Sequence, residues 1–213
     1  MARTKVGFLA SGRGSNFQSI AEAAKRGHVP IDPAVVVSNV PGAPVLERAK
    51  ELGVPAVLID HAPYGKDREA WEREVVKVLR QHGVELVVFA GFMRLVTPYF
   101  VAQFPGRILN IHPSLLPSFP GAHGVRDALE AGAKVSGVTI HFVDASLDGG
   151  PTVLQKAVPV EDGDTEASLA ARILEWEHRL YPLAVRLYAE GRLQIRGRRV
   201  AIDWAGIERP PSP

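Results

Sequence analysis

Three polar side chains in this sequence stand beside residues that restrain the backbone. His112 comes directly before Pro113, Asn110 stands two residues before His112, and Asp148 is followed by two glycines. An amide beside an imidazole can hold a developing oxyanion while the imidazole moves a proton. A carboxylate near the imidazole would raise its pKa and fix its tautomer. These residue types therefore indicate general acid–base chemistry.

Other interpretations of the same residues are possible. Asn110 could satisfy loop backbone, and His112 could be a core histidine with a structural partner. A metal site is a further alternative, because His112, His123, His141 and Asp148 are all possible ligands. Since none of them shows a tight ligand spacing such as His-Glu-x-x-His, we expect chemistry without a metal. No Gly-x-Ser-x-Gly motif supports a serine hydrolase.

A glycine-rich segment, Ser11-Gly-Arg-Gly-Ser-Asn16, lies between an expected strand and an expected helix. Glycines allow close approach of an anion, and free amides at a helix start donate to it, so this segment favours phosphate binding. It lacks the Gly-Lys-Ser/Thr of a P-loop, and Phe17 stands where a dinucleotide fold needs a third glycine. Ser38-Asn39 also replaces the acidic residue that would hold a ribose. The alternative is a plain glycine turn in which Ser15 or Asn16 caps the helix.

The segment from Ala90 to Val96 combines apolar residues with one guanidinium, that of Arg94. Such a loop could form a wall for a flat heteroaromatic ligand, or it could be an ordinary turn between a strand and a helix. On periodicity alone, Arg68 and Glu177 are surface charges on helices.

Short β-branched runs alternate with amphipathic segments of helical length. This alternation predicts an α/β fold, doubly wound around a mostly parallel central sheet, with a small C-terminal hairpin at Leu193–Arg196 and Arg199–Ile202. A long helix should begin near Thr165. Ligands in such folds gather at the C-terminal ends of the strands. The runs predicted as buried central strands are Val6–Ala10, Ala34–Ser38, Ala56–Ile59, Leu86–Ala90, Ile108–Ile111 and Val138–Val143.

Composition narrows the class of protein. The 213 residues have a formal net charge of +2, a mean hydropathy of +0.03 and no cysteine. The nearest basic cluster, Arg196, Arg198 and Arg199, fits a solvated hairpin end better than a nucleic-acid patch. No signal-like stretch and no apolar run near the ~18 residues of a membrane span occurs. We expect a cytoplasmic protein that binds neither nucleic acid nor membrane.

Taken together, the motifs resemble the folate-dependent glycinamide ribonucleotide transformylases, a family of formyltransferases of purine synthesis. The likeness spans about residues 5–195, and one departure is Val125, where many relatives have a second histidine. The matching motifs, in order, are Ser11-Gly-Arg-Gly-Ser-Asn16, Ala90-Gly-Phe-Met-Arg94, Asn110-Ile-His-Pro-Ser-Leu-Leu-Pro117, Pro120-Gly-Ala-His123, Leu147-Asp-Gly-Gly-Pro151 and Glu177-His178.

The resemblance implies transfer of the formyl group of 10-formyltetrahydrofolate to the amine of 5-phosphoribosylglycinamide, giving N-formylglycinamide ribonucleotide and tetrahydrofolate, without a metal. It assigns the oxyanion to Asn110, general acid–base catalysis to His112, and orientation of His112 to Asp148. It also implies a Rossmann-like formyltransferase fold and a cis peptide at Leu116–Pro117. The implied ribonucleotide-binding residues are Gly14, Ser15, Asn16 and Glu177, and the implied folate-binding residues are Arg68, Met93, Arg94, Leu95, Val96, Val143 and Asp144.

We expect one domain over residues 1–213. A phosphate-binding half covers about 1–100, a catalytic and folate-binding half about 101–195, and the C-terminal hairpin and tail 196–213. The expected partners are the two small-molecule substrates, with the chain as a monomer or homodimer. Two alternatives stay open: a hydrolase of 10-formyltetrahydrofolate, and a non-catalytic folate- or nucleotide-binding protein on the same fold.

Overall fold

The computed structural model describes residues 3–210. The chain forms two compact units, Met1–Asn110 and Ile111–Pro213. The end of the predicted tail, residues 211–213, lies outside the described part. No helix in the described part is long and apolar enough to cross a membrane.

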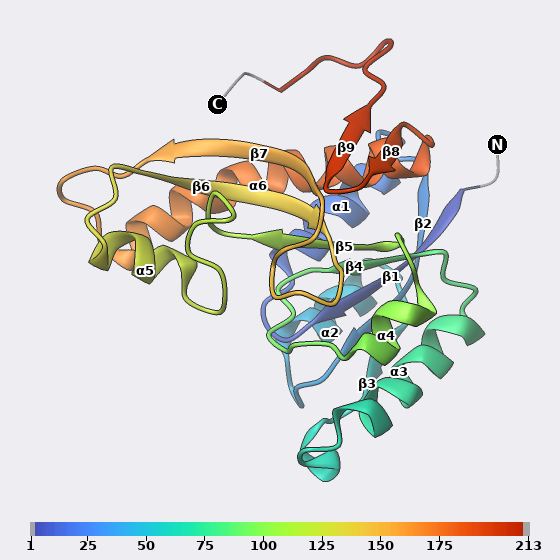
Figure 1. Ribbon diagram of the computed structural model, residues 1–213. Coiled ribbons are helices and arrows are strands. Elements are labelled where there is room, and N and C mark those ends of the chain that lie inside the picture. Colours follow the sequence, from blue (N-terminus) through green and yellow to red (C-terminus); the bar gives the residue numbers. More distant parts are fainter. Residues whose placement is uncertain (1–2, 211–213) are drawn as a thin grey trace. The chain divides into compact units, whose positions relative to one another are not determined.

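The first unit is built on parallel strands in the order β3-β2-β1-β4-β5 (Figure 1). Apolar residues predominate in β1 after Lys5 and in all of β4, and these parts of both strands are buried, as expected for strands covered on both faces. The strands are β1 (Thr4–Ala10), β2 (Ile31–Ser38), β3 (Ala56–Leu58), β4 (Leu86–Phe89) and β5 (Ile108–His112), the last of which continues into the second unit.

Helices connect these strands. Because parallel crossovers are right-handed, the reversal of strand order after β3 puts α1 and α2 on one face of the strands and α3 and α4 on the other. The fold of this unit is therefore doubly wound. The connecting elements are α1 (Ser15–Lys25), α2 (Pro44–Glu51), a 3₁₀ turn η1 (Ala62–Tyr64), α3 (Arg68–Gln81) and α4 (Pro98–Gln103).

The second unit combines an antiparallel pair, β6 and β7, with a long helix, α6, that packs on both strands and on α5. Thr165 caps α6 by accepting a hydrogen bond from the Ser168 amide, so the predicted start of this helix is confirmed. The hairpin is confirmed at its predicted bounds, and β9 adds to β7 in parallel. The elements are α5 (Gly124–Glu130), β6 (Val135–Phe142), β7 (Thr152–Pro159), α6 (Glu166–Ala189), β8 (Leu193–Arg196) and β9 (Arg199–Ile202).

The α/β fold with a mostly parallel sheet is confirmed, with one correction to its strands. The prediction that Ala56–Ile59 is a central strand is wrong, because β3 is the first strand in the order and Leu58 is 44% exposed. An edge strand is covered less than its neighbours, so its apolar composition misled the prediction. The division into a phosphate half and a catalytic half stays a prediction.

Candidate active site

The glycine loop follows β1 and leads into α1. Gly14 is the N-cap residue, in the left-handed region with φ 72°, and no side chain caps the helix start. A Cβ on Gly14 would lie 2.3 Å from Cγ2 of Val45, so only glycine fits there. Ser15 and Asn16 form the first turn, where helix amides point outward along the axis. Amides at such a helix start can donate to an anion, and the phosphate-binding role of this loop stays a prediction.

The loop after β4 exposes two apolar side chains, Met93 at 71% and Leu95 at 57%. Its far end is held by Glu72 of α3, whose carboxylate accepts hydrogen bonds from the amide of Thr97, at 2.7 Å, and from the Thr97 hydroxyl. Arg94 lies over the Trp71 ring, 5.3 Å from its centroid. A restrained loop with exposed apolar groups can bind a flat apolar ligand at little ordering cost.

Two guanidinium groups, those of Arg68 and Arg94, influence each other in this region. Burial lowers the pKa of Arg94, the positive charge of Arg68 lowers it further, and Glu72 opposes both. Within residues 3–210, neither arginine forms a salt bridge. Arg68 is exposed at the start of α3. Two neighbouring cations without an ion-pair contact favour an anionic ligand group.

Asn110 and His112 lie near the end of β5 and are separated by one residue. Alternation along a strand puts their side chains on the same side of β5, as the sequence predicts. Asn110 is partly exposed, whereas His112 is buried with 4% of its surface exposed.

The imidazole of His112 has a defined tautomer. Its Nε2 lies 2.8 Å from the carbonyl oxygen of Phe119, and because a carbonyl only accepts, Nε2 carries a hydrogen and donates it. Its Nδ1 lies 3.6 Å from Oδ2 of Asp148. That distance is longer than a hydrogen bond of about 3.2 Å or less. The ring nitrogen that faces Asp148 is therefore Nδ1.

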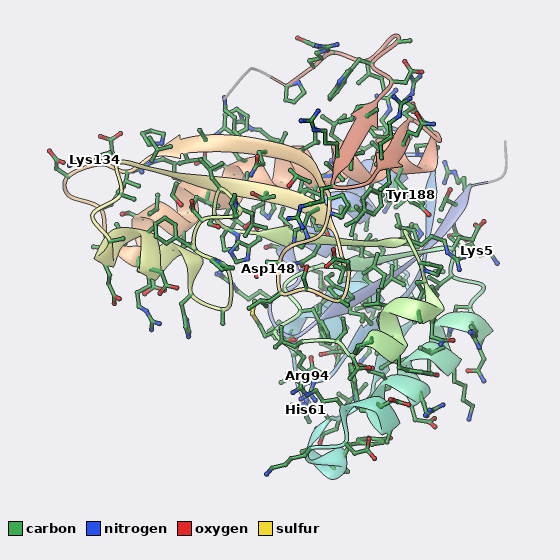
Figure 2. The ribbon with its side chains drawn as sticks, in the orientation of Figure 1. Lys5, His61, Arg94, Lys134, Asp148 and Tyr188 are labelled. Atoms are coloured by element: carbon green, nitrogen blue, oxygen red, sulfur yellow. The ribbon has the colours of Figure 1, made fainter. Side chains whose placement is uncertain are left out.

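Asp148 itself is held by backbone. It adopts the left-handed conformation, φ 49°, in the loop between β6 and β7, where Figure 2 labels it. Its Oδ2 accepts a hydrogen bond of 2.8 Å from the amide of Gly121. A Cβ on Gly150 would lie 1.9 Å from the carbonyl oxygen of Phe142, so this glycine is required by close packing.

Two contacts here were missed by reasoning from the sequence: the Phe119 carbonyl on His112 and the Gly121 amide on Asp148. His141 was considered only as a possible metal ligand. His141 lies in β6 with 2% exposure, and its Nε2 is 3.8 Å from Oδ1 of Asp148. Burial lowers the pKa of His141, partly offset by its hydrogen bond to the Phe142 carbonyl and by Asp148, so the ring is neutral at pH 7. Pro120-Gly121 was a usable signal, because this pair favours a turn that points a backbone amide inward.

The remaining predicted residues of the second unit lie in the loop between β6 and β7 and on α6. Asp144 accepts a hydrogen bond from the Ser146 amide, at 2.8 Å, and Val143 is partly buried. Glu177 is 8% exposed on α6, so its interpretation as a surface charge is wrong. Glu177 lies on a helix face that is more apolar than the periodicity of its nearest neighbours in sequence indicated.

The Leu116–Pro117 peptide is cis, as the resemblance implied. Within the part of the chain that the structure describes, no group of three or more His, Asp or Glu side chains is arranged to hold a metal ion.

Comparison with known proteins supplies the family. Residues 4–185 match the sequence profile of the formyl transferase family. The chain belongs to this family. It is 42% identical to the phosphoribosylglycinamide formyltransferase of Escherichia coli over 203 residues, which cover 95% of this chain and 94% of that one.

Two further relatives of this formyl transferase agree. The trifunctional purine biosynthetic protein adenosine-3 of Gallus gallus is 43% identical over 95% of this chain, which spans only 20% of that longer protein. The crystal structure of glycinamide ribonucleotide transformylase 1 from Symbiobacterium toebii matches with a TM-score of 0.92 and 51% identity, covering 94% of each chain. The backbone and the sequence therefore indicate the same family.

Proposed function

We propose that this formyl transferase moves the formyl group of 10-formyltetrahydrofolate to the amine of 5-phosphoribosylglycinamide. The products are N-formylglycinamide ribonucleotide and tetrahydrofolate. The observation that carries the proposal is the 42% identity to the Escherichia coli phosphoribosylglycinamide formyltransferase across nearly the whole of both chains. The buried pair of His112 and Asp148 supports it, because formyl transfer requires a proton to be moved.

The reaction needs one oxyanion and one proton transfer. The amine nitrogen attacks the formyl carbon, and the carbonyl π electrons move to the oxygen. The bond from carbon to the folate nitrogen then breaks, that nitrogen gains a proton, and the amine loses one. The Asn110 amide donates to the oxyanion, which is the type of interaction that stabilises such intermediates most.

His112 and Asp148 handle the proton. With Nε2–H held by the Phe119 carbonyl, the proton that His112 gives and receives is the one on Nδ1. The Asp148 carboxylate stabilises the charged ring at 3.6 Å and is itself kept in place by the Gly121 amide. His112 is therefore the general acid and base, and Asp148 is the charge partner that orients it.

The other predicted residues bind the two substrates. The amides of Gly14, Ser15 and Asn16 receive the phosphate of the ribonucleotide, and Glu177 binds its ribose or glycinamide end. The folate contacts come from the apolar loop after β4, the arginine pair and the residues after β6: Arg68, Met93, Arg94, Leu95, Val96, Val143 and Asp144. The protein acts in the cytoplasm, as a monomer or homodimer.

A transfer assay with 10-formyl-5,8-dideazafolate separates this function from its alternatives. We expect the deformylated folate to be released when 5-phosphoribosylglycinamide is added, and not with buffer alone. Glycinamide without the ribose phosphate is the matched control, and it should give no transfer at the same concentration because it lacks the phosphate.

Each other outcome has a defined meaning. Release of free formate without the ribonucleotide would identify a hydrolase. Binding of the folate with no turnover under either condition would identify a non-catalytic binding protein. Both results would refute formyl transfer to the ribonucleotide amine.

A further inference from the structure

A short chain of hydrogen bonds joins the glycine loop to the loop after β4, and both loops belong to the first unit. The amide of Met93 donates to Oγ of Ser11 at 2.9 Å. The Ser11 hydroxyl donates in turn to Oδ1 of Asn39 at 2.7 Å. The backbone amide of Ser11 also donates to the Gly91 carbonyl at 3.0 Å. Ser11 is thus bound to the loop after β4 through both its backbone and its side chain.

The direction of this chain is set by its members. A backbone amide can only donate, so the oxygen of Ser11 accepts from Met93 and its own hydrogen is left for Asn39. One hydroxyl therefore serves a donor and an acceptor at once. A side chain without a hydroxyl would leave both the Met93 amide and Oδ1 of Asn39 without these bonds.

Asn39 is fixed from its other side. It is 3% exposed. Its backbone carbonyl oxygen lies 2.7 Å from Nδ1 of His61, and because a carbonyl only accepts, this nitrogen donates the hydrogen bond. The segment before His61 is tied to α3, because Nε1 of Trp71 donates to the Ile59 carbonyl at 2.7 Å. Figure 2 labels His61 and Arg94, which follow β3 and β4 respectively. The Ser11 hydroxyl therefore donates to a residue that is itself restrained.

We infer that Ser11 is a positioning residue that couples ribonucleotide binding at the glycine loop to folate binding at the loop after β4. The inference rests on the proposed function, because that function assigns a ligand to each loop. A phosphate held by the Gly14–Asn16 amides restrains the segment that begins at Ser11, and the hydroxyl passes the restraint to the Met93 backbone. Each ligand then reduces the ordering cost of the other, and the effect is reciprocal.

The test measures binding of 5,8-dideazafolate, which carries no formyl group, by calorimetry with and without saturating 5-phosphoribosylglycinamide. We expect the ribonucleotide to tighten folate binding by about 3- to 10-fold in the wild type, the range that one hydrogen bond supplies. Ser11→Val should lower this factor, because only the backbone bond from Ser11 to the Gly91 carbonyl remains. Ser11→Thr, which has the shape of valine but retains a hydroxyl, should keep it. Hydrogen exchange at the Met93 amide should slow with the ribonucleotide alone in the wild type and not in Ser11→Val.

A matched control is Ser19→Ala, which removes a hydroxyl that donates to the Asn16 carbonyl within α1 and makes no bond to the loop after β4. Its coupling factor should equal that of the wild type. If the Ser11 variants fail to fold, Asn39→Asp keeps the acceptor and Asn39→Leu removes it, with the same two expected results.

Unchanged coupling in Ser11→Val, or independent binding of the two ligands in the wild type, would overturn the inference. Failure of the ribonucleotide to bind at all would instead refute the proposed function. Normal binding of each ligand without coupling would refute only the role of Ser11, so the two failures are distinguishable.

Discussion

At the scale of single residues, the candidate site depends on backbone groups as much as on side chains. The Phe119 carbonyl selects the tautomer of His112, and the Gly121 amide holds Asp148. Side-chain carboxylates and imidazoles are flexible about their terminal torsions, so fixed backbone partners reduce the orientations they sample. The same arrangement recurs at Glu72, where one buried carboxyl group meets two donors of Thr97.

Glu72 gives a prediction about pH. Burial raises its pKa above the usual 4.5, and the bonds from Thr97 offset this only in part. A carboxyl group with a raised pKa binds its proton more tightly when folded, so its contribution to stability is full below pH 4.5 and is lost as the pH rises through the higher folded value. In Glu72→Gln, the amide oxygen accepts from the Thr97 amide and the amide nitrogen donates to the hydroxyl, without a charge. We expect the free energy of unfolding of Glu72→Gln to rise relative to the wild type between pH 4 and pH 7, in urea titrations at fixed ionic strength.

Glu72→Ala is the contrasting variant, because it leaves the Thr97 amide without its acceptor. It should be about 1–3 kcal/mol less stable than Glu72→Gln at every pH, the cost of an unsatisfied buried donor, because neither variant titrates at this position. A wild type that gains stability over Glu72→Gln as the pH rises would contradict this account, since the ionised carboxylate would then be the favoured form.

At the scale of elements, the loop between β5 and α5 brings two required backbone groups to the His112–Asp148 pair. Gly121 has φ 94°, a conformation that L-residues rarely adopt, while the space around its α-carbon is open. Its cost of substitution is therefore conformational and not steric. The conformation of this turn directs the Gly121 amide at Asp148.

Gly121→Ala should consequently impair catalysis. We expect a stability loss of about 1–2 kcal/mol, as for other L-residues forced into the left-handed region, and a fall in kcat of about tenfold from the weakened bond to Asp148. KM for either substrate should change less than kcat. Steady-state kinetics and thermal unfolding of the same preparation test both parts.

Gly132→Ala is the matched control, because Gly132 has φ 67° in equally open surroundings and its amide bonds only the end of α5, at Leu129. It should show a similar stability loss with an unchanged kcat. Equal kcat values for the two variants would mean that Gly121 acts through folding alone.

At the scale of the whole molecule, the sequence predicts the alternation of strands and helices well. Buried β-branched runs mark β1, β2, β4, β5 and β6 because central strands are apolar on both faces. The prediction missed β7, where Gln155 and Lys156 interrupt the apolar pattern, and it misassigned β3, whose exposure depends on its place at the edge. Strand order and edges depend on contacts distant in sequence, which periodicity does not report.

The candidate site is predictable to a different degree. Asn110, His112 and Asp148 could be named because their types and neighbouring prolines or glycines are unusual together. Three features could not be predicted, because each depends on a partner from another segment of the chain. They are the tautomer of His112, the burial of Glu177 and the bond between Ser11 and Met93. Local sequence indicates which groups do chemistry, and tertiary structure decides how each group is held.

The most direct test of the account is the turnover of Asp148→Asn in the formyl-transfer assay with saturating 5-phosphoribosylglycinamide. The asparagine oxygen can still accept from the Gly121 amide, so the loop is kept while the charge beside Nδ1 of His112 is lost. Asp127→Asn, which changes a partly exposed carboxylate on α5, is the control and should leave turnover unchanged. We predict that kcat of Asp148→Asn falls by roughly 10²–10³, as when a group that stabilises developing charge is removed, with thermal unfolding unaltered. Turnover near that of the wild type in a folded Asp148→Asn protein would contradict the account.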